Sequence, residues 1–124
     1  MRARIAAIAT AGLLGAAVCV QAGTLADLPP GCDRNTYEIV QCQIRELAKL
    51  NGRLENAYRA ALEGSEAGQR DALAEAQALW LKFRAADCDY YSKASGTIAS
   101  VRAGYCMLDL TRTRAEEFEE AVSP

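Results

Sequence analysis

Apolar side chains recur at alternating steps of three and four between about residues 36 and 63, which is the spacing of one helix face. A break with two glycines at residues 64–68 separates this pattern from a second helical pattern at about residues 69–93. After a further break at residues 95–97, where Ser95 or Thr97 can serve as a cap, a third pattern runs to about residue 121. No stretch alternates in the manner of a strand. The sequence therefore predicts an all-α fold.

The first and third patterns each predict one inward-facing stripe. Asn51 is the single polar member of the first stripe, and a polar residue inside a helix seam usually sets helix register. The apolar members expected to face inward are Tyr37, Val40, Ile44, Leu47, Leu54, Tyr58 and Ala61 in the first helix, and Ile98, Val101, Tyr105, Leu108, Ala115 and Phe118 in the third.

The second pattern is different, because two stripes on this helix contain apolar residues. One stripe holds Leu73, Gln77, Trp80, Arg84, Cys88 and Tyr91. The other holds Ala72, Leu79, Phe83, Ala86 and Tyr90. Because a helix with two buried stripes packs against two neighbours, we expect the second helix to lie between the others in a three-helix, up-down-up antiparallel bundle.

A group of polar residues surrounds the only tryptophan, Trp80. Reflecting the first hairpin about residues 65–66 places Asn51 opposite Trp80, with Gln77 and Arg84 on the same stripe as the tryptophan. These four residues form either a functional site in a groove or a structural hydrogen-bond network, and we favour the network. A buried Arg84 needs a partner, and the nearest carboxylate along the helix is Asp87.

The first 22 residues are typical of a secretory signal peptide. Arg2 and Arg4 precede an apolar run at residues 5–20, and small residues lead to a cleavage site after Ala22. Cleavage there removes 22 of the 124 residues and leaves 102. We therefore expect a protein of the periplasm or a secreted protein, with no stable membrane insertion after cleavage.

An alternative is a lipoprotein acylated at Cys19. Val18 fits poorly there, because such sites require a small residue before the cysteine. Beyond the signal peptide, residues 23–35 contain two prolines and predict an irregular lead-in, followed by a helical domain at residues 36–121.

Four cysteines remain after cleavage, and an even set in an oxidising compartment predicts two disulfides. Cys88 and Cys106 each lie nine residues from Thr97, so they reach the same height on the second hairpin. We prefer a Cys88–Cys106 bridge with a Cys32–Cys42 bridge. Cys42 and Cys88 also have similar heights on the first hairpin, and the sequence leaves all three pairings open.

The composition limits which activities and partners we expect. The chain has no histidine, and it shows no phosphate-binding loop, nucleophile elbow or metal-ligand pattern, so we expect no enzymatic activity and no cofactor. Without Arg2 and Arg4, 12 basic residues face 16 acidic ones. This balance disfavours nucleic acid and suits a cationic protein partner.

Four acidic residues gather near the C-terminus, where Arg112 and Arg114 are spaced to form ion pairs with them. The run is either a solvated helix end, which we favour, or an acidic patch that binds a basic protein. Its members are Glu116, Glu117, Glu119 and Glu120.

One set of residues resembles the LprI-type domain family, which is named for a lysozyme inhibitor. The resemblance runs from Cys32 to about Phe118, and its most specific residues are Leu50, Asn51, Tyr58, Gln77, Trp80, Arg84, Cys88, Cys106, Thr111 and Arg114. It implies an exported, helical, cysteine-bearing protein that blocks a basic, lysozyme-type muramidase by occlusion. Two other hypotheses are an adaptor of the cell envelope that binds another protein and a small helical lipid carrier. A carrier needs an apolar cavity, whereas the aromatic and leucine residues suffice only to fill a core.

Overall fold

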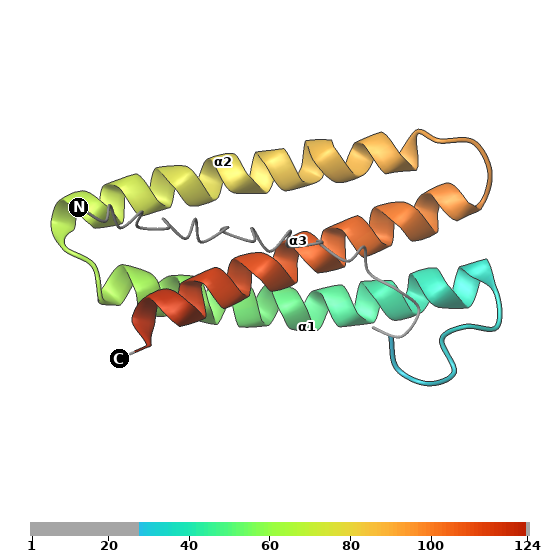
Figure 1. Cartoon of the computed structure of the whole chain (residues 1–124), viewed down its shortest axis with the longest axis horizontal. Helices are drawn as coiled ribbons and strands as arrows, with labels where there is room; N and C mark the ends of the chain where they lie inside the picture. The colour runs from blue at the N-terminus through green and yellow to red at the C-terminus, as the bar shows by residue number, and fades with distance from the viewer. Residues whose placement is uncertain (1–27, 124) are drawn as a thin grey trace, which may run out of the picture.

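A computed structural model describes residues 28–123 and shows a three-helix bundle. Helix α1 (Thr36–Glu63), helix α2 (Ala67–Ser92) and helix α3 (Ile98–Val122) run up, down and up, each antiparallel to the next (Figure 1). The predicted all-α bundle is confirmed. The expected signal peptide at residues 1–22, Cys19 and the first part of the lead-in lie outside the described residues.

Local hydrogen bonds explain where α1 and α2 begin. The Asn35 side chain accepts a hydrogen bond of 3.0 Å from the backbone N–H of Glu38, as an N-cap residue does. At the start of α2, Glu66 and Gln69 form a reciprocal capping box. These contacts satisfy backbone N–H groups that have no partner inside the helix.

The turn before α3 is built differently. Gly96 has a φ of 86°, a left-handed conformation that glycine adopts without steric cost. Thr97, one of the two predicted capping residues, occupies the N-cap position, but its side chain makes no capping hydrogen bond. Gly96, rather than a capping hydroxyl, shapes this turn.

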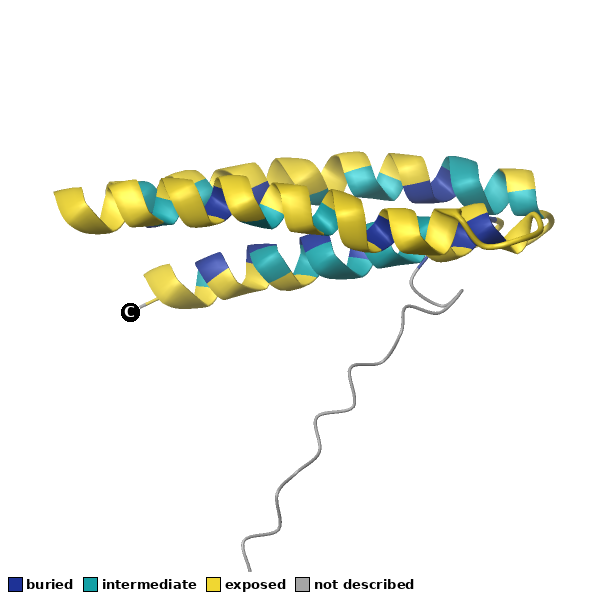
Figure 2. Ribbon diagram, turned by 90° about the horizontal axis from the view of Figure 1, so that it is seen from above, coloured by how far each residue is buried: buried dark blue, intermediate teal, exposed yellow. Residues whose placement is uncertain are grey.

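Helix α3, not α2, is the central helix of the bundle. It packs against both other helices, whereas α1 and α2 touch at only a few positions. In Figure 2, α3, which leads to the C-terminus, carries its buried residues on the side turned toward the other helices. The prediction that α2 lies between the other two helices is wrong.

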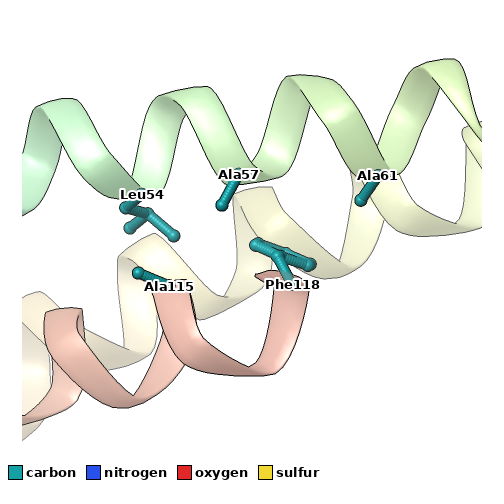
Figure 3. Close-up of a cluster of buried hydrophobic side chains, with 5 residues drawn as sticks. All are labelled: Leu54, Ala57, Ala61, Ala115 and Phe118. Carbon is teal, nitrogen blue, oxygen red and sulfur yellow. The ribbon is translucent and has the colours of Figure 1, made fainter. Parts of the chain in front are cut away.

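The core divides into two clusters, both shared by α1 and α3. In one, Leu54, Ala57 and Ala61 of α1 point toward Ala115 and Phe118 of α3 (Figure 3). Alanines on both helices let the two backbones approach closely. The second cluster lies toward the other end of the bundle and contains Leu28, Cys32, Cys42 and Leu108.

Gly104 of α3 marks another close approach to α1. A Cβ at this position would overlap Oε1 of the buried Gln43 and would lie 2.9 Å from its Nε2. Gln43 Nε2 donates a hydrogen bond of 2.9 Å to the backbone oxygen of Val101, which joins the two helices. Neither residue stood out in the sequence, because a helical glycine and a glutamine are ordinary on an exposed face.

Only the first of the two predicted stripes on α2 is turned inward. Gln77 and Cys88 are buried, and Trp80 and Arg84 are partly buried. The second stripe is exposed along its whole length, as are five positions that were expected inside the other helices or on the inner stripe. The exposed residues of the second stripe are Ala72, Leu79, Phe83, Ala86 and Tyr90, and the other five are Tyr37, Ile44, Asn51, Tyr91 and Ile98.

The disulfides connect Cys32 with Cys42 and Cys88 with Cys106, so the preferred pairing is confirmed. The first ties the lead-in to α1, and the second ties α2 to α3. Disulfides persist in oxidising environments, so the pair indicates an extracytoplasmic protein. Among residues 28–123, no helix has the length and apolar character needed to cross a membrane.

Candidate functional site

The predicted polar residues meet where the three helices come together. Nη1 of Arg84, on α2, donates hydrogen bonds of 2.8 Å to Oγ1 of Thr111 on α3 and 3.0 Å to Oδ1 of Asn51 on α1. Thr111 is fully buried, and its hydroxyl donates in turn to the backbone oxygen of Met107 at 2.6 Å. One guanidinium therefore links all three helices and helps to define their register.

Two guanidinium groups lie near the Trp80 ring. Cζ of Arg84 is 5.0 Å from the centroid of the tryptophan ring, and Cζ of Arg114 is 5.9 Å from it. Arg114 also lies 4.4 Å from the ring centroid of Phe118. These distances suit cation–π attraction, which is stronger where water is partly excluded. Trp80 therefore joins the α1–α3 cluster to the polar residues of the α2–α3 contact.

The guanidinium of Arg114 completes this arrangement from α3. Its Nε donates a hydrogen bond of 3.1 Å to Oε1 of the buried Gln77, and its Nη1 lies 2.8 Å from Oε2 of Glu117. The predicted ion pair between Arg114 and Glu117 is confirmed. The contact with Gln77 was not predicted.

Among residues 28–123, no carboxylate forms an ion pair with Arg84. Asp87 is not its partner, contrary to expectation, and Nε of Arg84 is buried without a hydrogen bond among the described residues. Burial lowers the pKa of the Arg84 guanidinium. The group stays protonated near neutral pH, because arginine retains its proton in proteins. Its charge is stabilised by the oxygens of Asn51 and Thr111 and by the face of Trp80.

Arg84→Gln is expected to lower the free energy of unfolding by about 1 to 3 kcal/mol, because it removes a charge-assisted contact among three helices. Arg84→Lys is expected to be nearly as destabilising as Arg84→Gln, since an ammonium lacks the planar donor geometry of the guanidinium. Urea denaturation measures both. Arg102→Gln, an exposed position on α3, is the control and is expected to change stability by no more than about 0.5 kcal/mol. Equal stability of Arg84→Gln and the control would contradict this role.

The C-terminal acidic run is largely engaged in ion pairs. Glu119 binds Arg53 of α1 through two hydrogen bonds, of 2.7 and 2.6 Å, and Glu116 lies 3.9 Å from the same arginine. The Arg53 hydrogen bond is the main reason that the pKa of the Glu119 carboxyl is lowered. Arg112 was expected to pair with Glu116, but it pairs with Asp109 at 3.1 Å instead. With Glu117 also paired, this geometry favours a helix contact over a free acidic patch.

A groove separates α1 from α2, because these two helices hardly touch. It has a volume of about 340 Å³ and is lined by Asn51, Leu54, Glu55, Tyr58, Ala74, Gln77, Ala78 and Leu81. The part of the chain that the structure describes contains no group of three histidine, cysteine or acidic side chains that is able to hold a metal ion. Apart from Nε of Arg84, the hydrogen bonds of Arg84 and Arg114 around Trp80 link helices to one another, as in a structural network.

The chain matches the family model described as "Lysozyme inhibitor LprI" over residues 31–118. No curated protein and no solved structure matches it. The matched region includes both disulfides and the three-helix polar cluster, and it covers well over half of the chain. Every residue on which the resemblance rested lies inside it. The chain therefore belongs to the lysozyme inhibitor LprI family.

Proposed function

We propose that this protein inhibits lysozyme-type muramidases by binding to the enzyme and obstructing its substrate cleft. The observation that carries the proposal is the family match from Gly31 to Phe118. The family is named for inhibition of an enzyme and not for a reaction of its own. We accordingly infer a binding protein without catalytic activity.

The form of the bundle suits inhibition by occlusion. Two disulfides and short connections between long helices hold the surface in one shape, so little conformational entropy is lost on binding. The excess of acidic residues in the chain after residue 22 suits a cationic enzyme. Muramidases act on cell walls that carry anionic polymers, and a positive enzyme surface favours association with such substrates.

The proposed site of action is the periplasm or the exterior of the cell, which agrees with the disulfides and the family. We infer export through the signal peptide at residues 1–22. The intact mass of the exported protein tests this inference, because cleavage after Ala22 leaves 102 residues, whereas processing at Cys19 leaves a longer, acylated chain.

The decisive measurement is clearance of a cell-wall suspension by lysozyme in the presence of increasing amounts of the exported protein. The expected result is slower clearance that reaches its limit near one inhibitor per enzyme. Unchanged clearance at a large molar excess would overturn the proposal.

A small soluble oligosaccharide substrate separates occlusion from protection of the wall. If the protein covers the catalytic cleft, hydrolysis of the oligosaccharide falls together with wall clearance. Inhibition on walls alone would mean that the protein acts on the wall and would contradict occlusion. Reduced and alkylated protein is the control for the folded bundle, since it retains the composition and loses both disulfides.

A further inference from the structure

Helix α2 presents a continuous apolar face to solvent. Its residues follow one another at steps of four and three, which places them in one row along the helix. Leu79 is 58% exposed, Phe83 is 53% exposed and Tyr90 is 74% exposed. We call this row the outer face of α2, and it consists of Ala72, Ala76, Leu79, Phe83, Ala86 and Tyr90.

This face has no partner among the three described helices, because α2 packs on α3 through its other stripe and scarcely touches α1. A helix with apolar side chains on two sides normally buries both. Rows of exposed apolar residues mark binding surfaces, and aromatic side chains contribute most strongly to binding energy at interfaces. The Tyr90 ring lies edge-on to Tyr91, with centroids 5.3 Å apart, which helps to hold an otherwise exposed ring in place.

The carboxylates around this face differ from those on the other helices. Asp71, Glu75 and Asp87 are exposed and make no ion pair with any residue that the structure describes. On α1 and α3, by contrast, many carboxylates pair with a nearby arginine or lysine, among them Glu38, Glu46, Asp109, Glu116, Glu117 and Glu119. Uncompensated negative charge therefore flanks the outer face of α2.

Basic residues near the same face do not cancel this charge. Lys93 pairs with Asp89 at 3.5 Å, and a hydrogen bond from Ser92 is the main cause of the lowered pKa of the Asp89 carboxyl, which keeps it ionised. Lys82 is the remaining cation on α2 whose side chain lies beside the outer face. Arg102 of α3 lies near Tyr90 at one end of the face. Four carboxylates thus oppose two ammonium groups and one guanidinium on this side of the bundle.

We propose that the outer face of α2 is the surface that docks on the muramidase, with the apolar row at the centre and the carboxylates against cationic groups of the enzyme. This inference rests on the proposed function and adds the site to it. The occupant is a basic protein and not a second copy of the chain, because self-pairing of α2 brings an acidic rim toward another acidic rim. The C-terminal acidic run, whose charges are largely paired internally, is not the docking surface.

The apolar part of the proposal is tested with the Leu79→Ser/Phe83→Ser double variant in the full exported chain. The concentration that half-inhibits lysozyme is expected to rise by about tenfold or more, as for loss of an interface hot spot. The matched control is Tyr37→Ser/Ile44→Ser, since these side chains on α1 are 72% and 57% exposed. The control is expected to inhibit like the unmodified protein.

The charged part is tested with Asp71→Asn/Glu75→Gln/Asp87→Asn. This variant is expected to slow association with lysozyme and to weaken its dependence on salt, because rim charges act chiefly on the association rate. Glu63→Gln/Glu120→Gln removes exposed carboxylates elsewhere and is expected to leave the rate unchanged. The carboxylate variant alters no packed side chain, so it tests the surface even where an apolar variant lowers stability.

The outcomes separate the docking surface from the function. If the unmodified protein inhibits lysozyme and both α2 variants inhibit equally well, the docking surface is overturned and the proposed function stands. If the unmodified protein does not inhibit, both proposals fall. Sedimentation that shows a dimer dissociated by Leu79→Ser/Phe83→Ser would assign the face to a second copy and would also overturn the inference.

Discussion

Phe118→Ala is expected to lower the free energy of unfolding by about 3 to 5 kcal/mol, as for other buried phenylalanines that leave a cavity. The side chain is 5% exposed and lies among Leu54, Ala57 and Ala61. Its ring centroid is 5.7 Å from that of Tyr58, and the Arg114 guanidinium lies over its face. The alanines of this cluster have no side-chain freedom with which to fill the space left behind.

The chain provides a matched control for this experiment, because it contains only two phenylalanines. Phe83 is 53% exposed on the outer face of α2, and Phe83→Ala is expected to change stability by about 0.5 kcal/mol or less. Chemical denaturation of both variants measures the difference. If Phe83→Ala is as destabilising as Phe118→Ala, the outer face of α2 is covered in solution.

The Cys88→Ala/Cys106→Ala variant, which lacks the Cys88–Cys106 bridge, is expected to have a free energy of unfolding lower by about 3 kcal/mol. The reason is that the unfolded chain regains conformational freedom without the bridge. The two cysteines are 18 residues apart in sequence, and Cys88 is buried. The bridge is also the covalent attachment of α2 to α3 beyond their connecting turn. Guanidinium denaturation of the oxidised variant measures the loss.

The second bridge is the comparison. Cys32→Ala/Cys42→Ala opens a span of only 10 residues, for which the same entropic argument gives about 2.7 kcal/mol. Hydrogen exchange distinguishes the two variants further. Faster exchange throughout α2 is expected only without Cys88–Cys106, because α2 otherwise relies on Leu73, Trp80 and a few polar contacts. Unchanged α2 exchange in that variant would show that the polar contacts suffice.

Helix positions and disulfides were predictable from the sequence for local reasons. Periodicity and glycine breaks mark the three helices, and the equal distance of Cys88 and Cys106 from Thr97 matches their heights in the hairpin. The place of each helix in the bundle was not predictable in this way. Periodicity identifies an apolar stripe but not what covers it, and α1 approaches α3 closely through alanines and Gly104, which carry little hydrophobic signal.

The sequence predicted which polar residues lie near Trp80, but it did not predict the hydrogen bonds that they form. Asn51, Gln77 and Arg84 do gather around Trp80, although Asn51 remains exposed. Thr111 was missed as the acceptor for Arg84. A signal for it exists, because the apolar row of α3 lacks a member between Leu108 and Ala115, and Thr111 occupies that gap. Helical spacing predicts the face on which a residue lies. It does not predict which residue of another helix a long arginine side chain reaches, because that depends on how the helices pack.

The placement of the two disulfides determines how the chain responds to being cut. Cys32–Cys42 closes a loop before residues 64–66, and Cys88–Cys106 closes one after them. Among residues 28–123, therefore, no disulfide joins α1 to the α2–α3 pair. A protease that cleaves between α1 and α2 therefore releases two separate polypeptides on a denaturing gel, even without reductant. After cleavage within residues 93–97, the fragments stay linked through Cys88–Cys106. The main contact of the fold, between α1 and α3, is thus held across the first hairpin by backbone continuity and non-covalent packing.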